Sequence, residues 1–158
     1  MRFGPTLLLA LLLGAGNAAL CDQRAVDALL AREAAPAGVV FEVIAGADGL
    51  RWAIPQVQRY SVQLRERFAD LPIAVVTHGR EQFALQTSEQ AEYTEVHAKV
   101  RSLVSEQQIP VHVCETHASW RGVSPEEFPD YVDVTPAGPV QIKNYQELGY
   151  ELVVVERD

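Results

Sequence analysis

One cysteine and three histidines in this chain have the types and spacing to support thiol chemistry. Cys114 ends a short β-branched stretch, His112 stands two residues before it, and His117 three after it. His78 follows another β-branched stretch earlier in the chain. A thiol is a weak nucleophile at its free pKa of about 8.5, and neighbouring imidazolium or N–H groups favour the reactive thiolate. These residues predict a reactive thiol at Cys114, with the three histidines as electrostatic helpers.

The elements that must position these residues can be predicted from apolar patterning. Short apolar runs rich in β-branched residues predict five strands, at residues 39–44, 73–77, 111–114, 131–135 and 151–156. Helical spacing of apolar residues, with capping and turn signals, predicts helices at residues 52–68, 89–106 and 139–148, a short one beginning at Asp22, and another after Ser124. This alternation predicts an α/β three-layer sandwich, Rossmann- or flavodoxin-like, with about five mostly parallel strands and helices on both faces.

A parallel sheet of this kind collects its functional groups at the carboxyl ends of its strands. His78 follows the predicted strand at residues 73–77 and Cys114 ends the one at 111–114, so both are expected at the same edge of the sheet. The side chain of His112 should point to the same face as that of Cys114, because side chains alternate along a strand. His117 follows in a tight loop. Trp120 lies in the same loop, where it could cover Cys114 and limit solvent access, although a tryptophan is more often a packing residue.

The beginning of the chain has the pattern of a bacterial signal peptide. Arg2 gives a basic start, residues 7–13 form a Leu/Ala run too short to span a membrane, and Gly16 and Ala18 supply small residues before a cleavage point. Cleavage after Ala18 would divide the chain into a signal peptide, residues 1–18, and one domain, residues 19–158. We therefore expect a periplasmic or secreted protein without a membrane span.

The charge balance restricts the partners. The chain has 13 basic and 21 acidic residues, a net charge of −8, and removal of the signal peptide with its one Arg would leave 12 and 21, or −9. An acidic surface argues against nucleic acid and against adsorption to anionic lipid. The sequence has no phosphate-binding loop and no Gly-rich fingerprint after the first strand, so we expect no nucleotide cofactor.

The residues alone leave other interpretations open. In an oxidising compartment Cys114 could pair with Cys21 in a structural disulfide, which would suit a non-catalytic exported binding or assembly module. Cys114 could equally be a buried, inert thiol. A third alternative is a small His/Cys metal-binding protein using His78, Cys114 and His117, although this is not a recognised ligand spacing. His97 is expected to be a half-buried surface histidine.

Two stretches of the chain resemble a known family. In the first stretch, a strand ends at Cys114 and is followed by Gly122 and by V-D-V-T-P-A-G at residues 132–138. A helix that ends at Gly149-Tyr150 comes next. The second stretch is P-I-A-V-V-T-H-G at residues 72–79. This order is similar to that of the DsrE/DsrF-like sulfur-relay family, in its exported single-domain branch, over residues 38–156.

The resemblance implies a function for Cys114. In the family, the cysteine at this strand end carries sulfane sulfur as a persulfide, which requires neither metal nor nucleotide. The chain departs from the exported branch three residues after the cysteine, where His117 replaces a Thr or Ser and the threonine is Thr116. The resemblance implies that this chain is a sulfur carrier and, if it is an enzyme, one of the sulfurtransferase type. Its partners would be sulfur donor and acceptor proteins or small sulfur compounds, and homo-oligomers would be possible.

Overall fold

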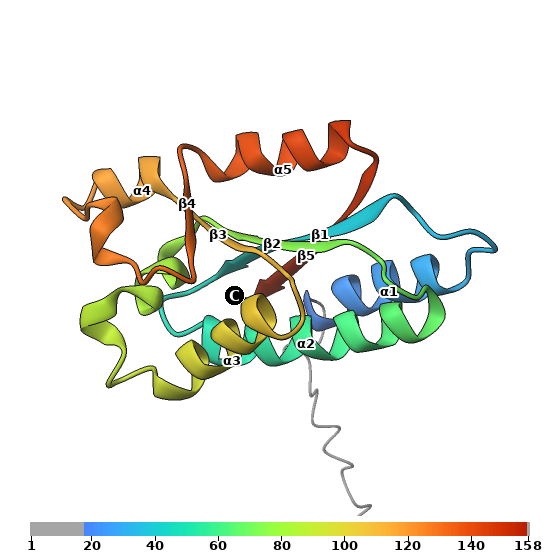
Figure 1. Cartoon of the computed structure of the whole chain (residues 1–158), viewed down its shortest axis with the longest axis horizontal. Helices are drawn as coiled ribbons and strands as arrows, with labels where there is room; N and C mark the ends of the chain where they lie inside the picture. The colour runs from blue at the N-terminus through green and yellow to red at the C-terminus, as the bar shows by residue number, and fades with distance from the viewer. Residues whose placement is uncertain (1–17, 158) are drawn as a thin grey trace, which may run out of the picture.

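The protein, described here from a computed structural model over residues 18–157, is built on a single five-stranded sheet (Figure 1). All neighbouring strands are parallel, in the order β4-β3-β2-β1-β5. The strands are β1 (Gly38–Ala45), β2 (Ile73–Thr77), β3 (Val111–Cys114), β4 (Asp133–Thr135) and β5 (Tyr150–Arg157). The predicted three-layer α/β architecture with five strands is therefore confirmed.

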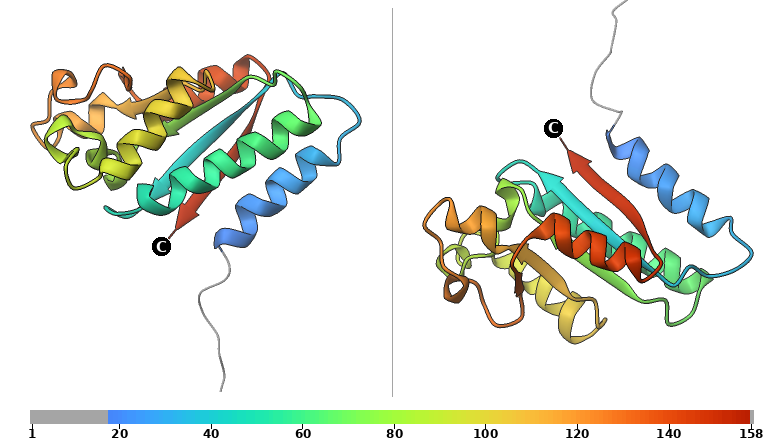
Figure 2. Two further views of the ribbon diagram at one scale, coloured as in Figure 1. Left: turned by 60° about the horizontal axis from the view of Figure 1, so that its bottom comes forward. Right: turned by 90° about the horizontal axis from the view of Figure 1, so that it is seen from above.

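Helices cover the two faces of the sheet unequally. On one face pack α1 (Ala18–Leu30), α2 (Leu50–Arg67) and α3 (Thr94–Ser105), whereas the long helix α5 (Gly138–Glu147) lies on the other (Figure 1). Figure 2 shows α5 alone across the sheet on its side. The five-residue helix α4 (Glu115–Ser119) follows β3 directly, beside the amino end of α5. Three short 3₁₀ segments complete the fold: η1 (Arg80–Leu85), η2 (Thr87–Glu89) and η3 (Pro125–Glu127).

This asymmetry divides the core into two parts. The large cluster lies between the sheet and the three helices α1, α2 and α3, and includes Phe41, Tyr60 and Leu103. The small cluster under α5 consists of Val40, Ala74, Val76 and Ile142. Because the central strands β1, β2 and β3 are buried on both faces, their sequences are nearly continuous apolar runs, which is why their positions could be predicted.

Several helix boundaries differ from the sequence-based prediction. Helix α1 begins at Ala18, so Asp22 lies inside it and does not cap it. Helix α3 begins at Thr94, because the residues before it form 3₁₀ and turn structure. The short segment after Ser124 is a 3₁₀ turn, with the predicted proline at its start and a capping box between Ser124 and Glu127.

The predicted signal peptide falls outside the described residues, except for Ala18. Within residues 18–157, none of the helices combines the length and the hydrophobicity needed to cross a membrane.

Candidate functional site

Cys114 lies at the carboxyl end of β3, at the base of a pocket of about 380 Å³. The thiol is free and the residue is 4% exposed. The pocket is formed by three segments that follow strands β2, β3 and β4, and its lining residues are His78, Cys114, Thr116, His117, Trp120, Ala137 and Pro139. Three of the four predicted site residues are thus brought together, as expected for the carboxyl edge of a parallel sheet.

The sulfur of Cys114 caps the first turn of α4. The main-chain N–H of His117 points at Sγ, with the nitrogen 3.5 Å from the sulfur. Cys114 keeps an extended backbone, φ −93° and ψ 112°, and the helix begins at the next residue. A first-turn N–H lacks a partner within its own helix, so an acceptor in the capping position satisfies it. Thiolate accepts such a bond more strongly than neutral thiol does.

A chain of hydrogen bonds joins the two pocket histidines. His117 donates its Nδ1–H to the main-chain oxygen of His78, with 2.8 Å between the two atoms. The Nε2–H of His78 in turn donates to Oε1 of Glu42 on β1, at 2.7 Å. Both members of the His78–Glu42 pair are mostly buried, at 18% and 17% side-chain exposure. The neutral His117 ring therefore carries its lone pair on Nε2, the nitrogen that has no protein partner in the described structure.

The side chain of Gln82 holds the peptide groups of Cys114. Its Oε1 accepts the N–H of Cys114 at 2.7 Å, and its Nε2 donates to the carbonyl oxygen of Cys114 at 3.4 Å. Strand β2 pairs with β3 only as far as Thr77, opposite Val113, and the chain then turns away. The buried amide of Gln82 thus takes the place of a strand partner at the last residue of β3.

The neighbouring Glu81 performs the same task for β1 and β2. Its carboxylate accepts hydrogen bonds from the N–H of Ala45, the hydroxyl of Thr77 and the N–H of Gly79. Glu81 is fully buried, and these donors replace the water that a buried carboxylate would otherwise need. Together Glu81 and Gln82 fix the carboxyl ends of three strands around the pocket.

His112 faces α5 and does not line the pocket. Its Nε2 is 2.8 Å from the hydroxyl of Tyr145, and its Nδ1 is 2.7 Å from a carboxylate oxygen of Asp133. Burial lowers the pKa of His112 below its ordinary value, and the nearby Asp133 carboxylate opposes this shift. His112 shares the α5 face of β3 with Cys114, but its contacts tie β3 to α5 and β4.

Sequence reasoning missed Glu42, Glu81 and Gln82. The run after His78 is polar, and a polar run is typical of an exposed loop, yet two of its residues are fully buried. The prediction for His97 was wrong: it is 1% exposed, and its Nε2–H donates to the carbonyl oxygen of Ala84. Glu42 interrupts an otherwise apolar strand, and this interruption was the available signal for a polar partner on the α5 face.

Trp120 lines the pocket while remaining 77% exposed. Its ring lies beside that of His117, with 5.8 Å between the ring centroids. Trp120 therefore forms part of the pocket wall and leaves most of its own surface in solvent.

The metal-binding alternative has no support in the described geometry, whereas the burial of Cys114 also fits an inert thiol. Within residues 18–157, no three His, Cys, Asp or Glu side chains are grouped so that they could hold a metal ion. Helix α1, which carries residue 21, packs against β5 and α2, on the face of the sheet opposite α5. Cys114 is a free thiol in this structure, and the side chain of Cys21, the other half of the predicted disulfide, lies outside the described part.

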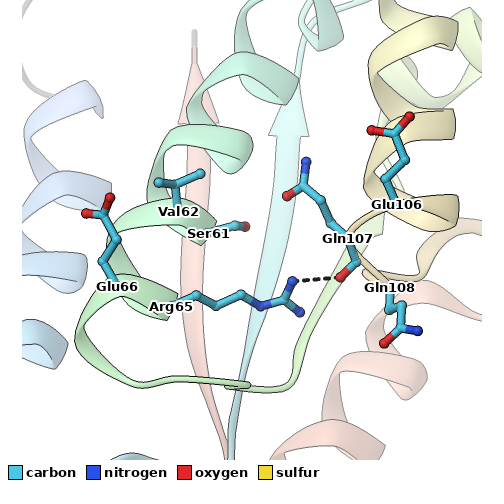
Figure 3. Close-up of a pocket in the computed structure, with 7 residues that line it drawn as sticks. All are labelled: Ser61, Val62, Arg65, Glu66, Glu106, Gln107 and Gln108. Carbon is cyan, nitrogen blue, oxygen red and sulfur yellow. Dashed lines mark hydrogen bonds between the residues drawn. The ribbon is translucent and has the colours of Figure 1, made fainter.

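Another hollow on the surface lies away from this chemistry. It has a volume of about 540 Å³ and lies between α2 and the residues that follow α3, on the face opposite α5 (Figure 3). Arg65 crosses it and donates to the carbonyl oxygen of Gln107 at 2.6 Å. The hollow contains no cysteine or histidine, so the pocket of Cys114 is the stronger candidate for a reactive site.

Comparisons with known proteins support the fold. No known family and no curated protein matches the sequence. Among solved structures, a protein of unknown function from Methanobacterium thermoautotrophicum, MTH1491, has a TM-score of 0.58 at 18% identity, over 73% of this chain and 96% of its own. The ychN protein from E. coli has a TM-score of 0.51 at 21% identity, over 76% of this chain and 99% of its own. BT1422 from Bacteroides thetaiotaomicron, also of unknown function, has a TM-score of 0.51 at 13% identity, over 73% and 93%.

Proposed function

We propose that this chain is a sulfur-relay protein, similar to the DsrE/DsrF-like family, that carries sulfane sulfur as a persulfide on Cys114. The proposal is supported above all by one observation: a free cysteine sulfur caps a helix at the end of β3 and forms the base of a pocket with two histidines. The amino-terminal sequence pattern supports a periplasmic or secreted location for this activity.

Sulfur transfer to Cys114 requires few groups. The Cys114 thiolate attacks the sulfane sulfur of a donor, a new sulfur–sulfur bond forms, and the donor's sulfur–sulfur bond breaks. The remainder of the donor leaves as a thiolate, or as sulfite when the donor is thiosulfate. A leaving thiolate that is basic enough takes a proton from solvent. An acceptor thiolate then attacks the outer sulfur and regenerates Cys114. No net oxidation occurs in the cycle, so neither a redox cofactor nor a metal is required.

Several described residues suit these steps. The His117 N–H stabilises negative charge on the Cys114 sulfur, both as the attacking thiolate and as the leaving group in the second transfer. The free Nε2 of His117 can accept a proton from an incoming thiol. Burial of Cys114 protects a persulfide from competing thiols in solvent.

The decisive test is the intact mass of the protein after incubation with a sulfane donor, followed by peptide mapping. We expect the mass of one sulfur atom to be added at Cys114 and removed by reductant. The Cys21→Ser variant should retain this addition, and the Cys114→Ser variant should lose it. A mass lower by two hydrogen atoms, with no addition even after reduction and removal of the reductant, would contradict the proposal and support the disulfide-containing module.

A further inference from the structure

We propose that the pocket of Cys114 selects sulfur donors with an uncharged, apolar body, such as organic polysulfanes, over anionic donors such as thiosulfate. This inference rests on the proposed function, because it specifies the class of molecule that brings sulfur to Cys114. It follows from the chemistry of the pocket walls, which are largely apolar, contain no Lys or Arg, and have several of their hydrogen-bond donors already engaged.

The pocket walls contain no permanent positive charge. Trp120, Ala137 and Pro139 give it an apolar surface, and no Lys or Arg lines it. The nearest carboxylate in the hydrogen-bond network, that of Glu42, lies behind His78. An anion in this pocket would therefore have no Lys or Arg to pair with, which is unfavourable where water is partly excluded.

Three side-chain donors of the lining are already engaged within the protein. The hydroxyl of Thr116 donates to the carbonyl oxygen of Pro136 at 2.6 Å. The Nδ1–H of His117 donates to His78, and the Nε2–H of His78 donates to Glu42. An incoming oxyanion would have to break one of these bonds to obtain a side-chain donor from Thr116 or from either of these ring N–H groups.

Three main-chain donors beside the thiol are also occupied, while the first-turn N–H groups of α5, which no side chain caps, border the pocket. The N–H of Thr116 donates to the carbonyl oxygen of Pro136, that of His117 to Sγ of Cys114, and that of Cys114 to Gln82. Pro139, at the start of α5, has no N–H to offer. An anion that lost its water beside the thiol would therefore gain few hydrogen bonds in return, whereas an alkyl group would lose only its contact with water.

The arginines closest to the pocket belong to a different hollow. Arg80 and Arg121 line a separate space of about 180 Å³. The rings of Phe83 and His117 pack edge to face between the two spaces, with 5.3 Å between their centroids. The guanidinium of Arg121 stacks on the Phe83 ring, 4.9 Å from its centre. These cations therefore do not alter the apolar character of the pocket at Cys114.

The size of the pocket and the position of Trp120 suit a small organic donor. A volume of about 380 Å³ lies within the range of roughly 300–1,000 Å³ in which proteins bind small molecules. The exposed Trp120 ring offers a flat apolar surface to an alkyl chain. A dialkyl trisulfide would place its sulfur atoms at Cys114 and its alkyl groups against Trp120 and Pro139.

The reaction with such a donor requires one further reagent, a thiol, and no oxidant. The Cys114 thiolate attacks the central sulfur of the trisulfide, one sulfur–sulfur bond breaks, and an alkanethiolate leaves and takes a proton from solvent. Cys114 then carries a mixed trisulfide. A second thiolate attacks the alkyl-bearing sulfur, forms a disulfide with it, and leaves the former central sulfur on Cys114 as the persulfide.

Three trisulfides of equal chain length test the inference: dipropyl, bis(2-carboxyethyl) and bis(2-aminoethyl) trisulfide. The rate at which each modifies Cys114 is measured by intact mass and divided by its rate with a free small thiol, which removes intrinsic reactivity. We expect the dipropyl compound to react roughly tenfold faster than either charged compound. Trp120→Ala should reduce this preference, and its exposure means that the substitution should leave the fold intact.

Each outcome distinguishes the inference from the proposed function. Equal or faster modification by the dicarboxylate overturns the selectivity, while persulfide carriage on Cys114 would stand. If the diamine modifies Cys114 fastest, the proposed selectivity is also overturned, because the preference among donors would then come from the acidic surface of the protein and not from the pocket. If none of the three compounds modifies Cys114, the proposed function falls, and the inference falls with it.

Discussion

His117 donates its Nδ1–H to the main-chain oxygen of His78, and this bond joins the segments that follow β3 and β2 above the sulfur of Cys114. The same residue points its main-chain N–H at that sulfur. His117 therefore connects the main chain of His78 to the thiol of Cys114. The predictions below follow from this network and from the buried residues that support it.

Gln82→Met should lower the free energy of unfolding by about 1–3 kcal/mol, because the N–H and carbonyl groups of Cys114 would lose their buried partner. Denaturant titration measures this change. Gln86→Met, in the same segment but partly exposed, is the matched control and should change stability by less than about 0.5 kcal/mol. Equal effects of the two substitutions would contradict the role assigned to Gln82.

Glu81→Gln should also destabilise the protein, by about 1–3 kcal/mol. The carboxylate accepts from three donors, and an amide would place its own N–H groups against at least one of them. Glu89→Gln, at a partly exposed position, controls for the loss of a negative charge. Thermal unfolding of both variants tests the prediction, which fails if Glu81→Gln melts with the wild-type protein.

Gly138→Ala should displace α5 from the end of β2. A methyl group at residue 138 would lie 2.6 Å from Cβ of His78, and neither of these two atoms is the flexible end of a side chain. We expect a loss of about 1–3 kcal/mol in stability and slower modification of Cys114. Gly46→Ala, where an added methyl meets no atom within 4 Å, is the control. Similar behaviour of the two variants would show that the contact between α5 and His78 is easily relaxed.

The protein should lose stability as the pH falls below about 6.5, the ordinary pKa of histidine. Burial lowers the pKa of both His97 and His112 in the folded state. The unfolded chain therefore binds protons at a higher pH than the folded chain. The stabilisation is complete above about 6.5 and is lost progressively down to the lowered folded pKa, by at most about 1.4 kcal/mol per pH unit for each histidine.

His97→Gln separates one of these contributions. The variant removes a titrating group that bonds Ala84 and Tyr131, so it should be less stable at pH 8. Its unfolding free energy should then decline less steeply between pH 6.5 and pH 5 than that of the wild-type protein. Parallel profiles for the two proteins would mean that His97 does not contribute to the acid sensitivity.

The sequence was sufficient to predict the sheet, because its three central strands, β1, β2 and β3, are apolar runs buried on both faces. The predicted strand positions also placed His78, Cys114 and His117 at one edge of the sheet, because the carboxyl ends of parallel strands meet there. The network that supports the site could not be predicted in this way. Glu81 and Gln82 are polar residues in a polar run, and only the distant main-chain groups that they bind explain their burial.

The same limit explains the errors at His97 and at the start of α3. Periodicity places His97 near the edge of an apolar helix face, but its burial depends on Ala84 and Tyr131, which lie elsewhere in the sequence. The polar residues before Thr94 have good helix propensity, yet η2 and a turn occupy that stretch. Tertiary contacts override local propensity in such cases.

The central claim is that Cys114 both accepts and releases sulfane sulfur, and cyanide release from a loaded protein tests it most directly. The protein is incubated with a trisulfide and a small thiol, freed of both, and treated with cyanide, which converts an outer persulfide sulfur to thiocyanate. We predict about one thiocyanate per chain from the wild-type protein and from Cys21→Ser, and none from Cys114→Ser. Undiminished thiocyanate from Cys114→Ser, or none from the wild-type protein, would contradict the account.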